Sequence, residues 1–449
     1  MTTRRGFTSL LARLVPVAAA LTAAALAGPA LDAPAWAQPA TAPVTPPVTP
    51  SCAWQAHSAA SDNVLAPDSA ATYYLLPFTA QEGLRIRLSG RYPDARYASL
   101  QAYDAGGSLF AVNGVSSALT DYQIQPERGS VNPWQPRAWP GRRRPAAGRF
   151  TVTLRSDVSP GQVNTLPLAP AGTAAGTEGY LAYRVYLPAG GDFSRVPLPA
   201  VTFTANGVTV AVPTCAAGGA SAPPAGAPGL SGAVTHSAAR DSAATGSAAT
   251  GSVVFTRAAV SSGGFPNADS GYLLAVVTPP GNGDVVVIRG RAPAWSRGSH
   301  PSPWPARGVD MRYWSMCDYL ATAVIPLVVN PLPDGATDYG CRDDAQTALD
   351  RHGDYTYVVG TEAQRAAIEA IRGATFVPFS TAQPATAHVL LLRNMLPSPD
   401  FAAAAQNVPP GSGAAGAAQV MGPYYPRAAV CPLATLAARG AGACLAGAS

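Results

Sequence analysis

The chain has 449 residues, 47% of them apolar and only 12% charged, so it can bury cores large enough for two or three domains. Its formal net charge of +5 is weak for a nucleic-acid-binding protein, and no strand and helix pattern of a nucleic-acid module is present. The 44 glycines and 45 prolines favour a loop-rich β protein over a helical one.

The first 37 residues have the pattern of a signal peptide. Arg4 and Arg5 form a basic start, residues 14–27 are a short apolar run, and residues 35–37 read Ala-Trp-Ala, a small-x-small cleavage signal. The paired arginines resemble a twin-arginine export signal, with an ordinary secretory leader as the alternative. No later segment is a candidate membrane span, so we expect an extracytoplasmic protein, periplasmic or secreted.

Six cysteines remain after the leader, an even number that predicts disulfides in an exported chain. The sequence cannot choose among the possible pairings, and we expect sequential pairing. No two cysteines have the spacing of a structural zinc site, so we expect no metal and no cofactor. The expected bridges are Cys52–Cys215, Cys317–Cys341 and Cys431–Cys444.

Two low-complexity stretches divide the chain. Residues 38–50 are rich in Pro, Thr and Ala and predict a disordered spacer, and residues 216–251 are rich in Ala, Gly, Ser and Pro and predict a linker. We therefore expect a first domain at 51–215, a second at 252–410 and a disulfide-stapled tail at 411–449.

The two sides of the linker repeat each other in short blocks that keep the same order. Residues 83–93 (GLRIRLSGRYP) align with 283–293 (GDVVVIRGRAP). Later blocks place Arg96 with Arg312, Asp121 with Asp338, and Arg184 with Arg393. This order indicates that the second domain is a duplicate of the first.

Local patterns within each copy predict strands. Leu84, Ile86 and Leu88 alternate with polar residues, as in a half-buried strand, and Asn206-Gly207 separates two such runs as a hairpin turn. One helix is expected after Thr361, whose capping box with Gln364 opens an apolar stripe. The chain therefore predicts a mainly β protein with two tandem jelly-roll-like β-sandwich domains, the second with a short added helix.

The repeated blocks resemble an uncharacterised family of exported bacterial β-sandwich proteins. The residues that carry this resemblance are 96–104 (RYASLQAYD), 120–122 (TDY) and 184–188 (RVYLP). They are similar to the domain of unknown function that ends many bacterial envelope proteins. The resemblance implies a fold, and it implies no chemistry.

Motifs for catalysis are weak. No nucleophile elbow, zinc-binding helix, phosphate-binding loop or calcium loop is present in the sequence. An enzyme would need a site between the two domains, for which the candidates are Asp310, Arg312, Asp338 and His352. His352-Gly353-Asp354 could place an imidazole near a carboxylate, but we expect a plain turn before the strand at Tyr355.

The repeated arginines allow two interpretations. Arg184 and Arg393 lie among apolar strand residues, so each needs a partner if it is buried. They could form an anion site in each domain, or internal ion pairs with Asp121 and Asp338 that fix the strand register. We expect the ion pairs.

Two proline-rich loops hold four of the seven tryptophans, at 132–145 and 295–308. Exposed Trp and Arg side chains can stack on sugars or grip an anionic polymer such as a cell-wall glycan. The alternative is that the tryptophans fold back as lids over the ends of the sandwiches. The candidate binding residues are Trp134, Arg137, Trp139, Trp295, Trp304 and Arg307.

Three functions are compatible with these patterns. We favour a non-enzymatic protein of the envelope or the medium that binds a ligand or polymer through the Trp/Arg loops. The alternatives are an extracytoplasmic hydrolase or lyase with a site between the domains, and a purely structural surface component.

Overall fold

The computed structural model describes residues 45–139, 145–216, 252–259, 263–281 and 283–446. The predicted leader, most of the spacer, the linker and Arg142, Arg143 and Arg144 lie outside the described residues, so these predictions are not tested.

The first sandwich consists of two sheets of five strands each. In both sheets the strands come from distant parts of residues 55–212, so each sheet closes only when the whole segment has folded. One sheet has the order β1 (Gln55–His57), β2 (Ala71–Thr79), β10 (Glu178–Pro188), β4 (Ala95–Tyr103) and β7 (Ala118–Thr120). The other has the order β12 (Val208–Val212), β11 (Ala200–Ala205), β3 (Arg85–Arg91), β8 (Arg149–Arg155) and β9 (Thr165–Pro167).

The core of this sandwich follows from the period-two pattern. Ile86 and Leu88 of β3 face Leu100 of β4 and Leu181 of β10, and all four side chains are fully buried. Arg85 and Arg87, which alternate with them, are exposed. A two-residue hairpin, β5 (Ala111–Val112) with β6 (Val115–Ser116), lies outside the two sheets.

The second sandwich repeats the arrangement with two sheets of four and five strands. The first has the order β14 (Ser270–Val277), β22 (His388–Pro397), β16 (Met311–Leu320) and β19 (Cys341–Asp343). The second has the order β13 (Ser252–Val253), β23 (Arg427–Pro432), β15 (Asp284–Arg291), β20 (Asp354–Gly360) and β21 (Ala374–Pro378). A short hairpin pairs β17 (Val329–Pro331) with β18 (Thr337–Tyr339).

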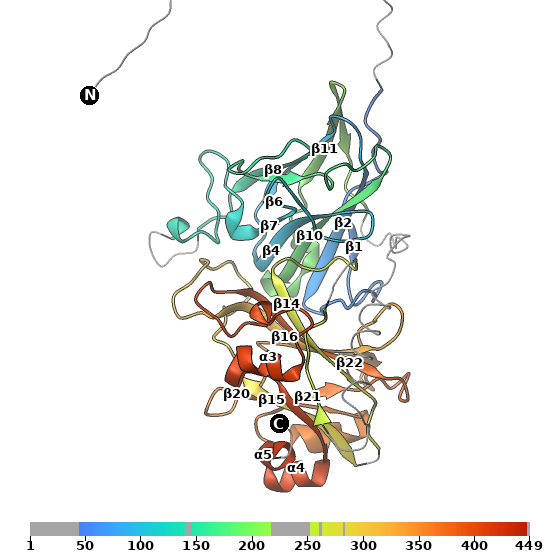
Figure 1. Cartoon of the computed structure of the whole chain (residues 1–449), viewed down its shortest axis with the longest axis vertical. Helices are drawn as coiled ribbons and strands as arrows, with labels where there is room; N and C mark the ends of the chain where they lie inside the picture. The colour runs from blue at the N-terminus through green and yellow to red at the C-terminus, as the bar shows by residue number, and fades with distance from the viewer. Residues whose placement is uncertain (1–44, 140–144, 217–251, 260–262, 282, 447–449) are drawn as a thin grey trace, which may run out of the picture. The chain divides into compact units, whose positions relative to one another are not determined.

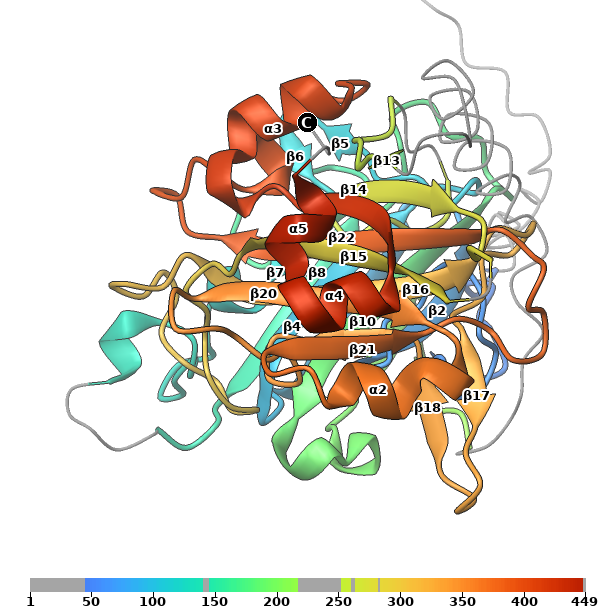
Figure 2. The same ribbon diagram turned by 90° about the horizontal axis from the view of Figure 1, so that it is seen from below.

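Short helices cover the five-stranded sheet of the second sandwich (Figure 2). The expected helix after Thr361 is present as a 3-10 turn, Glu362–Gln364, followed by α2 (Arg365–Glu369), and it begins with the predicted capping box. Ile368 of α2 and Leu436 of α4 (Leu433–Arg439) pack on this sheet. The C-terminal segment also contains α3 (Ala414–Met421) and α5 (Ala441–Leu445). Because β23 pairs with β15, this segment is built into the second sandwich.

Two of the four sheets are buried on both faces. Every residue of β4 and of β16 is buried, although one face of each strand already packs in its own sandwich. The other faces of these sheets meet each other, as shown by Tyr186 and Tyr313, whose ring centroids are 5.2 Å apart. We call the sheets of β2, β10 and β4 and of β14, β22 and β16 the inner sheets (Figure 1).

The mainly β, two-sandwich prediction is confirmed. All three expected disulfides are also confirmed, because the sulfur atoms of Cys52 and Cys215, of Cys317 and Cys341, and of Cys431 and Cys444 are bonded. Among the described helices, none combines the length and apolar character needed to cross a membrane.

Candidate functional site

Two buried ion pairs cross between the inner sheets in opposite directions. Arg96 of β4 lies 2.6 Å from Asp344, just after β19, and Arg312 of β16 lies 3.2 Å from Asp121, just after β7. All four side chains are almost fully buried. Each sandwich thus supplies one arginine and one aspartate to the contact.

The strand register shows that the two ion pairs are equivalent. Thr120 pairs with Ser99 in the first sandwich, and Asp343 pairs with Ser315 in the second. The residues that follow Thr120 and Asp343, Asp121 and Asp344, therefore occupy matching positions. The predicted match of Asp121 with Asp338 is wrong in terms of strand register, because Asp338 lies on β18.

The expected partners of the repeated strand arginines are also wrong. Asp121 pairs with Arg312, and Asp338 pairs with Arg342 at 2.9 Å and with Arg365. Arg184 and Arg393 point instead into the contact between the inner sheets, where segments of the opposite sandwich meet them.

The segment before β2, residues 66–68, lies against the second sandwich. Its carbonyl groups accept hydrogen bonds from Arg393 Nη2 at 3.3 Å and from the Tyr319 hydroxyl at 3.1 Å. Asp68 forms an ion pair with Arg393 and accepts a hydrogen bond from the Tyr313 hydroxyl at 2.8 Å.

The segment before β14, residues 265–267, lies against the first sandwich in the same way. Its carbonyl groups accept hydrogen bonds from Arg184 and from the Tyr103 hydroxyl, the latter at 2.7 Å. The Tyr97 hydroxyl donates to Asn267 at 3.1 Å. The two segments are therefore exchanged between the sandwiches, and Asn267 in the segment before β14 corresponds in position to Asp68 in the segment before β2.

This difference leaves the two arginines in unlike electrostatic environments. Arg393 is paired with a carboxylate, whereas the hydrogen-bond partners of Arg184 among the described residues are Gln101, Tyr103 and a backbone carbonyl. Burial raises the pKa of Tyr103 to about 12, so its phenol is neutral near neutral pH. The charge of Arg184 is thus not neutralised by a direct partner.

A cavity of about 600 Å³ lies between the inner sheets, next to both arginines. Its walls are mostly apolar, with Leu75, Leu274 and Leu391 from β2, β14 and β22. Ala258 is a half-buried residue of the wall. Its described residues include Arg184, Arg257, Arg393 and His57, and none of its described residues is Asp or Glu.

Four side chains that line this cavity have a buried polar atom without a hydrogen bond to any described residue. They are Arg184 through Nε, Arg393 through Nε, His57 through Nε2 and Ser270 through Oγ. Such atoms are rare in protein interiors, because an unpaired buried donor or acceptor costs about 1–3 kcal/mol. Their concentration on one apolar cavity makes it the candidate functional site.

His57 has a fixed orientation at the wall of the cavity. Its Nδ1 atom contacts the carboxylate of Asp62, which favours the tautomer that carries its proton on Nδ1. In that tautomer the Nε2 atom, which is buried, is a hydrogen-bond acceptor.

The predicted catalytic residues are not brought together. The Asp310 carboxylate accepts a hydrogen bond from the Ala294 amide at 2.8 Å, Arg312 and Asp338 are engaged in separate ion pairs, and His352 is exposed. None of the four belongs to the described wall of the cavity.

The tryptophan loops are largely folded inward. Trp134, Trp295 and Trp304 are buried, and the Trp304 amide donates to the Trp134 carbonyl at 2.8 Å. Trp304 also lies 4.8 Å from the guanidinium of Arg312. This burial fits the lid interpretation. A binding role for the loops stays a prediction, and it would depend on half-buried Trp139 and on exposed Arg137 and Arg307.

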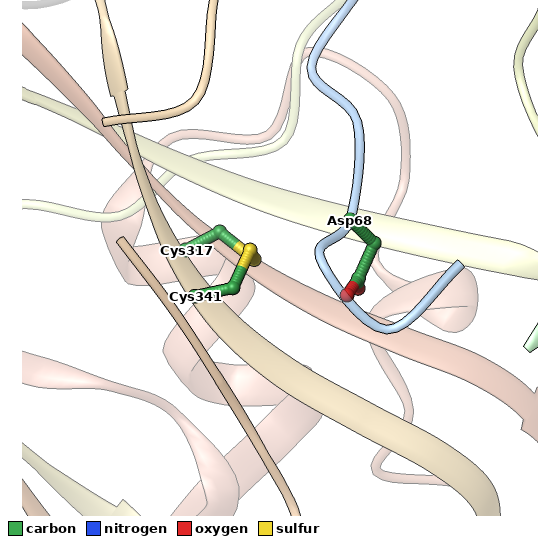
Figure 3. A group of neighbouring side chains, drawn as sticks. All are labelled: Asp68, Cys317 and Cys341. Atoms are coloured by element: carbon green, nitrogen blue, oxygen red, sulfur yellow. A yellow bond between two sulfur atoms is a disulfide. The ribbon is translucent and has the colours of Figure 1, made fainter. Parts of the chain in front are cut away.

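Asp68 lies beside Cys317 and Cys341, and the three are close enough to suggest a metal site (Figure 3). The two sulfur atoms are bonded to each other, so they are not thiolate ligands. The Asp68 carboxylate is also occupied by Arg393 and Tyr313. These residues therefore form a structural cluster that anchors Arg393.

No sequence pattern indicates that His57, Arg257 and Ser270 belong to one site. These residues come from three separate segments that meet only when the two sandwiches pack. A weak signal did exist for Arg184 and Arg393, since each interrupts a continuously apolar strand.

Comparisons with known proteins give remote likenesses. No family model matches the chain, and no curated protein matches it. A solved structure of an uncharacterised protein from Burkholderia cenocepacia is similar with a TM-score of 0.45 and 12% identity, over 86% of this chain and 83% of that one. The VPA0106 protein from Vibrio parahaemolyticus is similar with a TM-score of 0.38 and 12% identity, over 81% of this chain and 89% of that one. These likenesses carry no functional argument.

Proposed function

We propose that the protein binds a small organic ligand with a substantial apolar part in the cavity between the inner sheets. The observation that carries this proposal is the cavity of about 600 Å³ with apolar walls, whose lining side chains include four buried polar atoms without a hydrogen bond to any described residue. Its volume lies within the range of roughly 300–1,000 Å³ that is typical of small-molecule sites.

An extracytoplasmic location supports such a role and belongs to the same proposal. The leader-like pattern of residues 1–37 predicts export, and three disulfides suit an oxidising compartment. In this proposal the protein is a non-enzymatic binding protein of the envelope or the medium, related to the domain of unknown function that its repeated blocks resemble.

A hydrolase is the second candidate, and one observation favours it. His57 is oriented by Asp62 and its Nε2 atom lies at the cavity wall, as a general base would. Cleavage of a p-nitrophenyl alkanoate by the protein, lost in a His57→Gln variant that still binds ligand, would support this candidate. Binding without turnover would leave the binding function in place.

The binding proposal is tested with a neutral fluorescent probe, Nile red, and its displacement by 1-decanol. In the Ala258→Phe variant, a phenyl ring replaces a methyl group at the wall of the cavity, and we expect probe binding to be lost. Ala403→Phe is the matched control, because Ala403 is also half-buried and does not belong to the described wall. No binding by the unaltered protein, or equal binding by both variants, would overturn the proposal.

A further inference from the structure

We propose that the ligand is an amphipathic anion, a carboxylate on an apolar chain, and that Arg184 binds its charged group. This inference rests on the proposed binding function and adds the chemical class of the ligand. It comes from the charge of the cavity wall and from the unlike partners of two equivalent arginines.

The described wall of the cavity is positively charged. Arg184, Arg257 and Arg393 all belong to it, and none of its described residues is acidic. Arg257 is occupied by three backbone carbonyl groups, among them that of Ala405 at 3.1 Å. It adds positive potential at the cavity and has little capacity to bind the ligand directly.

Of the two remaining arginines, Arg393 is less suitable than Arg184 for binding the anionic group of the ligand. Its Nη1 atom is paired with Asp68, so an anion at this position would have to compete with a buried carboxylate. That carboxylate is also held by the hydroxyl groups of Tyr313 and Ser315, at 2.8 and 2.9 Å.

Arg184 occupies the equivalent position without such a carboxylate. Its side chain is 2% exposed, and its described partners are neutral. Asp269 is the acidic residue that acts on it through space, but the Asp269 oxygens are held by Tyr97 and Thr120 at 2.6 and 2.7 Å, and Asp269 does not belong to the described wall.

The geometry of the guanidinium favours a carboxylate. A buried cation is costly unless an anion neutralises it, and a ligand carboxylate in the cavity would do so. Arg184 belongs to the wall of the cavity, and hydrogen bonds between a guanidinium and a carboxylate are about twice as strong as those between neutral groups. Ser270, whose hydroxyl can donate, also belongs to the wall of the cavity.

The remaining wall accommodates an apolar chain. Leu75, Leu109 and Leu274 belong to it, together with Val389 and Leu391. Each further buried methylene group should raise the affinity about fourfold, so affinity should rise with chain length until the cavity is filled.

Gln101 allows the charge of Arg184 to be tested with a side chain of nearly unchanged volume, at the loss of the hydrogen bond that Gln101 Nε2 donates to Asn267 Oδ1 at 2.7 Å. Its Oε1 atom accepts a hydrogen bond from Arg184 Nη1 at 2.8 Å, and Gln101 itself does not belong to the described wall. Gln101→Glu places a carboxylate on Arg184 with nearly the same volume. Gln123→Glu is the matched control, because Gln123 is exposed and the variant has the same net charge.

The experiment compares decanoate with 1-decanol as competitors of Nile red near neutral pH. The unaltered protein and Gln123→Glu should bind decanoate at least about 10-fold more tightly than decanol, a difference of about 1.4 kcal/mol. Gln101→Glu should lose this preference and keep its affinity for decanol, and Arg184→Gln should do the same if it folds.

The outcomes separate this inference from the binding function itself. If the unaltered protein binds decanol as tightly as decanoate, or if Gln101→Glu keeps the preference, the anion assignment is overturned while ligand binding stands. If neither compound displaces the probe, and the probe does not distinguish Ala258→Phe from Ala403→Phe, the binding function fails as well.

Discussion

Nη1 of Arg312 lies 3.2 Å from Oδ2 of Asp121, and the two residues belong to different sandwiches. Its counterpart, Arg96 with Asp344, runs in the opposite direction at 2.6 Å. Because an unpaired buried charge is costly, a displacement of one sandwich against the other would break both pairs at once. The pairs therefore hold the inner sheets in one register and preserve the cavity between them.

We expect removal of one partner to destabilise the protein strongly. Arg312→Met leaves the Asp121 carboxyl group buried without its guanidinium partner, which should lower the free energy of unfolding at pH 8 by about 3–5 kcal/mol. Urea unfolding would measure the change. As a control, Asp157→Asn removes the partner of Arg155 in an exposed ion pair and should cost less than about 1 kcal/mol. Equal effects of the two substitutions would contradict the role given to the buried pair.

The buried carboxylates also predict the pH dependence of stability. Burial raises the pKa of Asp121 to about 6 and that of Asp344 to about 7, although their arginine partners oppose the shift. Both values exceed the ordinary 3.8, so the folded protein holds protons that the unfolded chain releases. The contribution of these groups to stability is therefore full below pH 4 and is lost as the pH rises toward 7.

This dependence is measured by urea unfolding at a series of pH values between 4 and 7. A single carboxyl group contributes a slope of at most roughly 1.4 kcal/mol per pH unit. Asp344→Asn does not titrate, so its stability should fall less steeply than that of the unaltered protein over this interval. A variant with an unchanged or steeper slope would show that the Asp344 carboxyl is not responsible.

The strands could be predicted because the alternation of apolar and polar residues is local. The disulfides could be predicted from the even number of cysteines and their order in the chain. Alternation at Leu84, Ile86 and Leu88 identifies a half-buried strand, and the same residues are fully buried in the structure. The partners of the arginines could not be predicted in this way. Arg393 meets Asp68, more than 300 residues earlier, and nothing in either local segment indicates the other.

The similar sequence blocks also show that residues with matching sequence need not occupy matching positions in the sheets. Thr337-Asp338-Tyr339 has the same letters as residues 120–122, yet strand register matches Asp121 with Asp344. The three-residue motif recurs in the β17–β18 hairpin, which does not pair with β16. The residue that matches Asp121 is instead identified by the strand that does pair with β16, which is β19. The cavity was beyond sequence reasoning, because it forms between the outward faces of two sandwiches.

The disulfide of the inner sheet should affect both stability and the cavity. Cys317 lies opposite Cys341 on paired strands, and the Sγ atom of Cys317 is 3.9 Å from Arg393 Nη1. Closing a loop of this length is worth about 3 kcal/mol in the chain-entropy model. Replacing both cysteines by serine should lower the unfolding free energy by this amount and weaken probe binding.

The third disulfide provides the control for that variant. Cys431 and Cys444 close a shorter loop at the C-terminal end, with a sequence separation of 13 against 24, and neither residue belongs to the described wall of the cavity. Serine at both positions should destabilise the protein comparably and leave the affinity for Nile red unchanged in the folded state. If both double variants bind the probe alike, the first disulfide does not shape the cavity.

Substitution of Trp304 and of Trp139 would distinguish a structural role of the tryptophan loops from a binding role. Trp304 is 2% exposed and lies on the Arg312 guanidinium, so Trp304→Ala should cost about 3–5 kcal/mol of stability. Trp139 is half-buried, with its indole nitrogen donating to the Pro133 carbonyl at 2.7 Å, and Trp139→Ala should cost less. If the loops bind cell-wall glycans, Trp139→Ala should reduce glycan affinity in a stably folded protein. Unchanged affinity in that variant would leave the loops with the role of covering the Arg96 and Arg312 ion pairs, and an unaltered stability of Trp304→Ala would contradict even this.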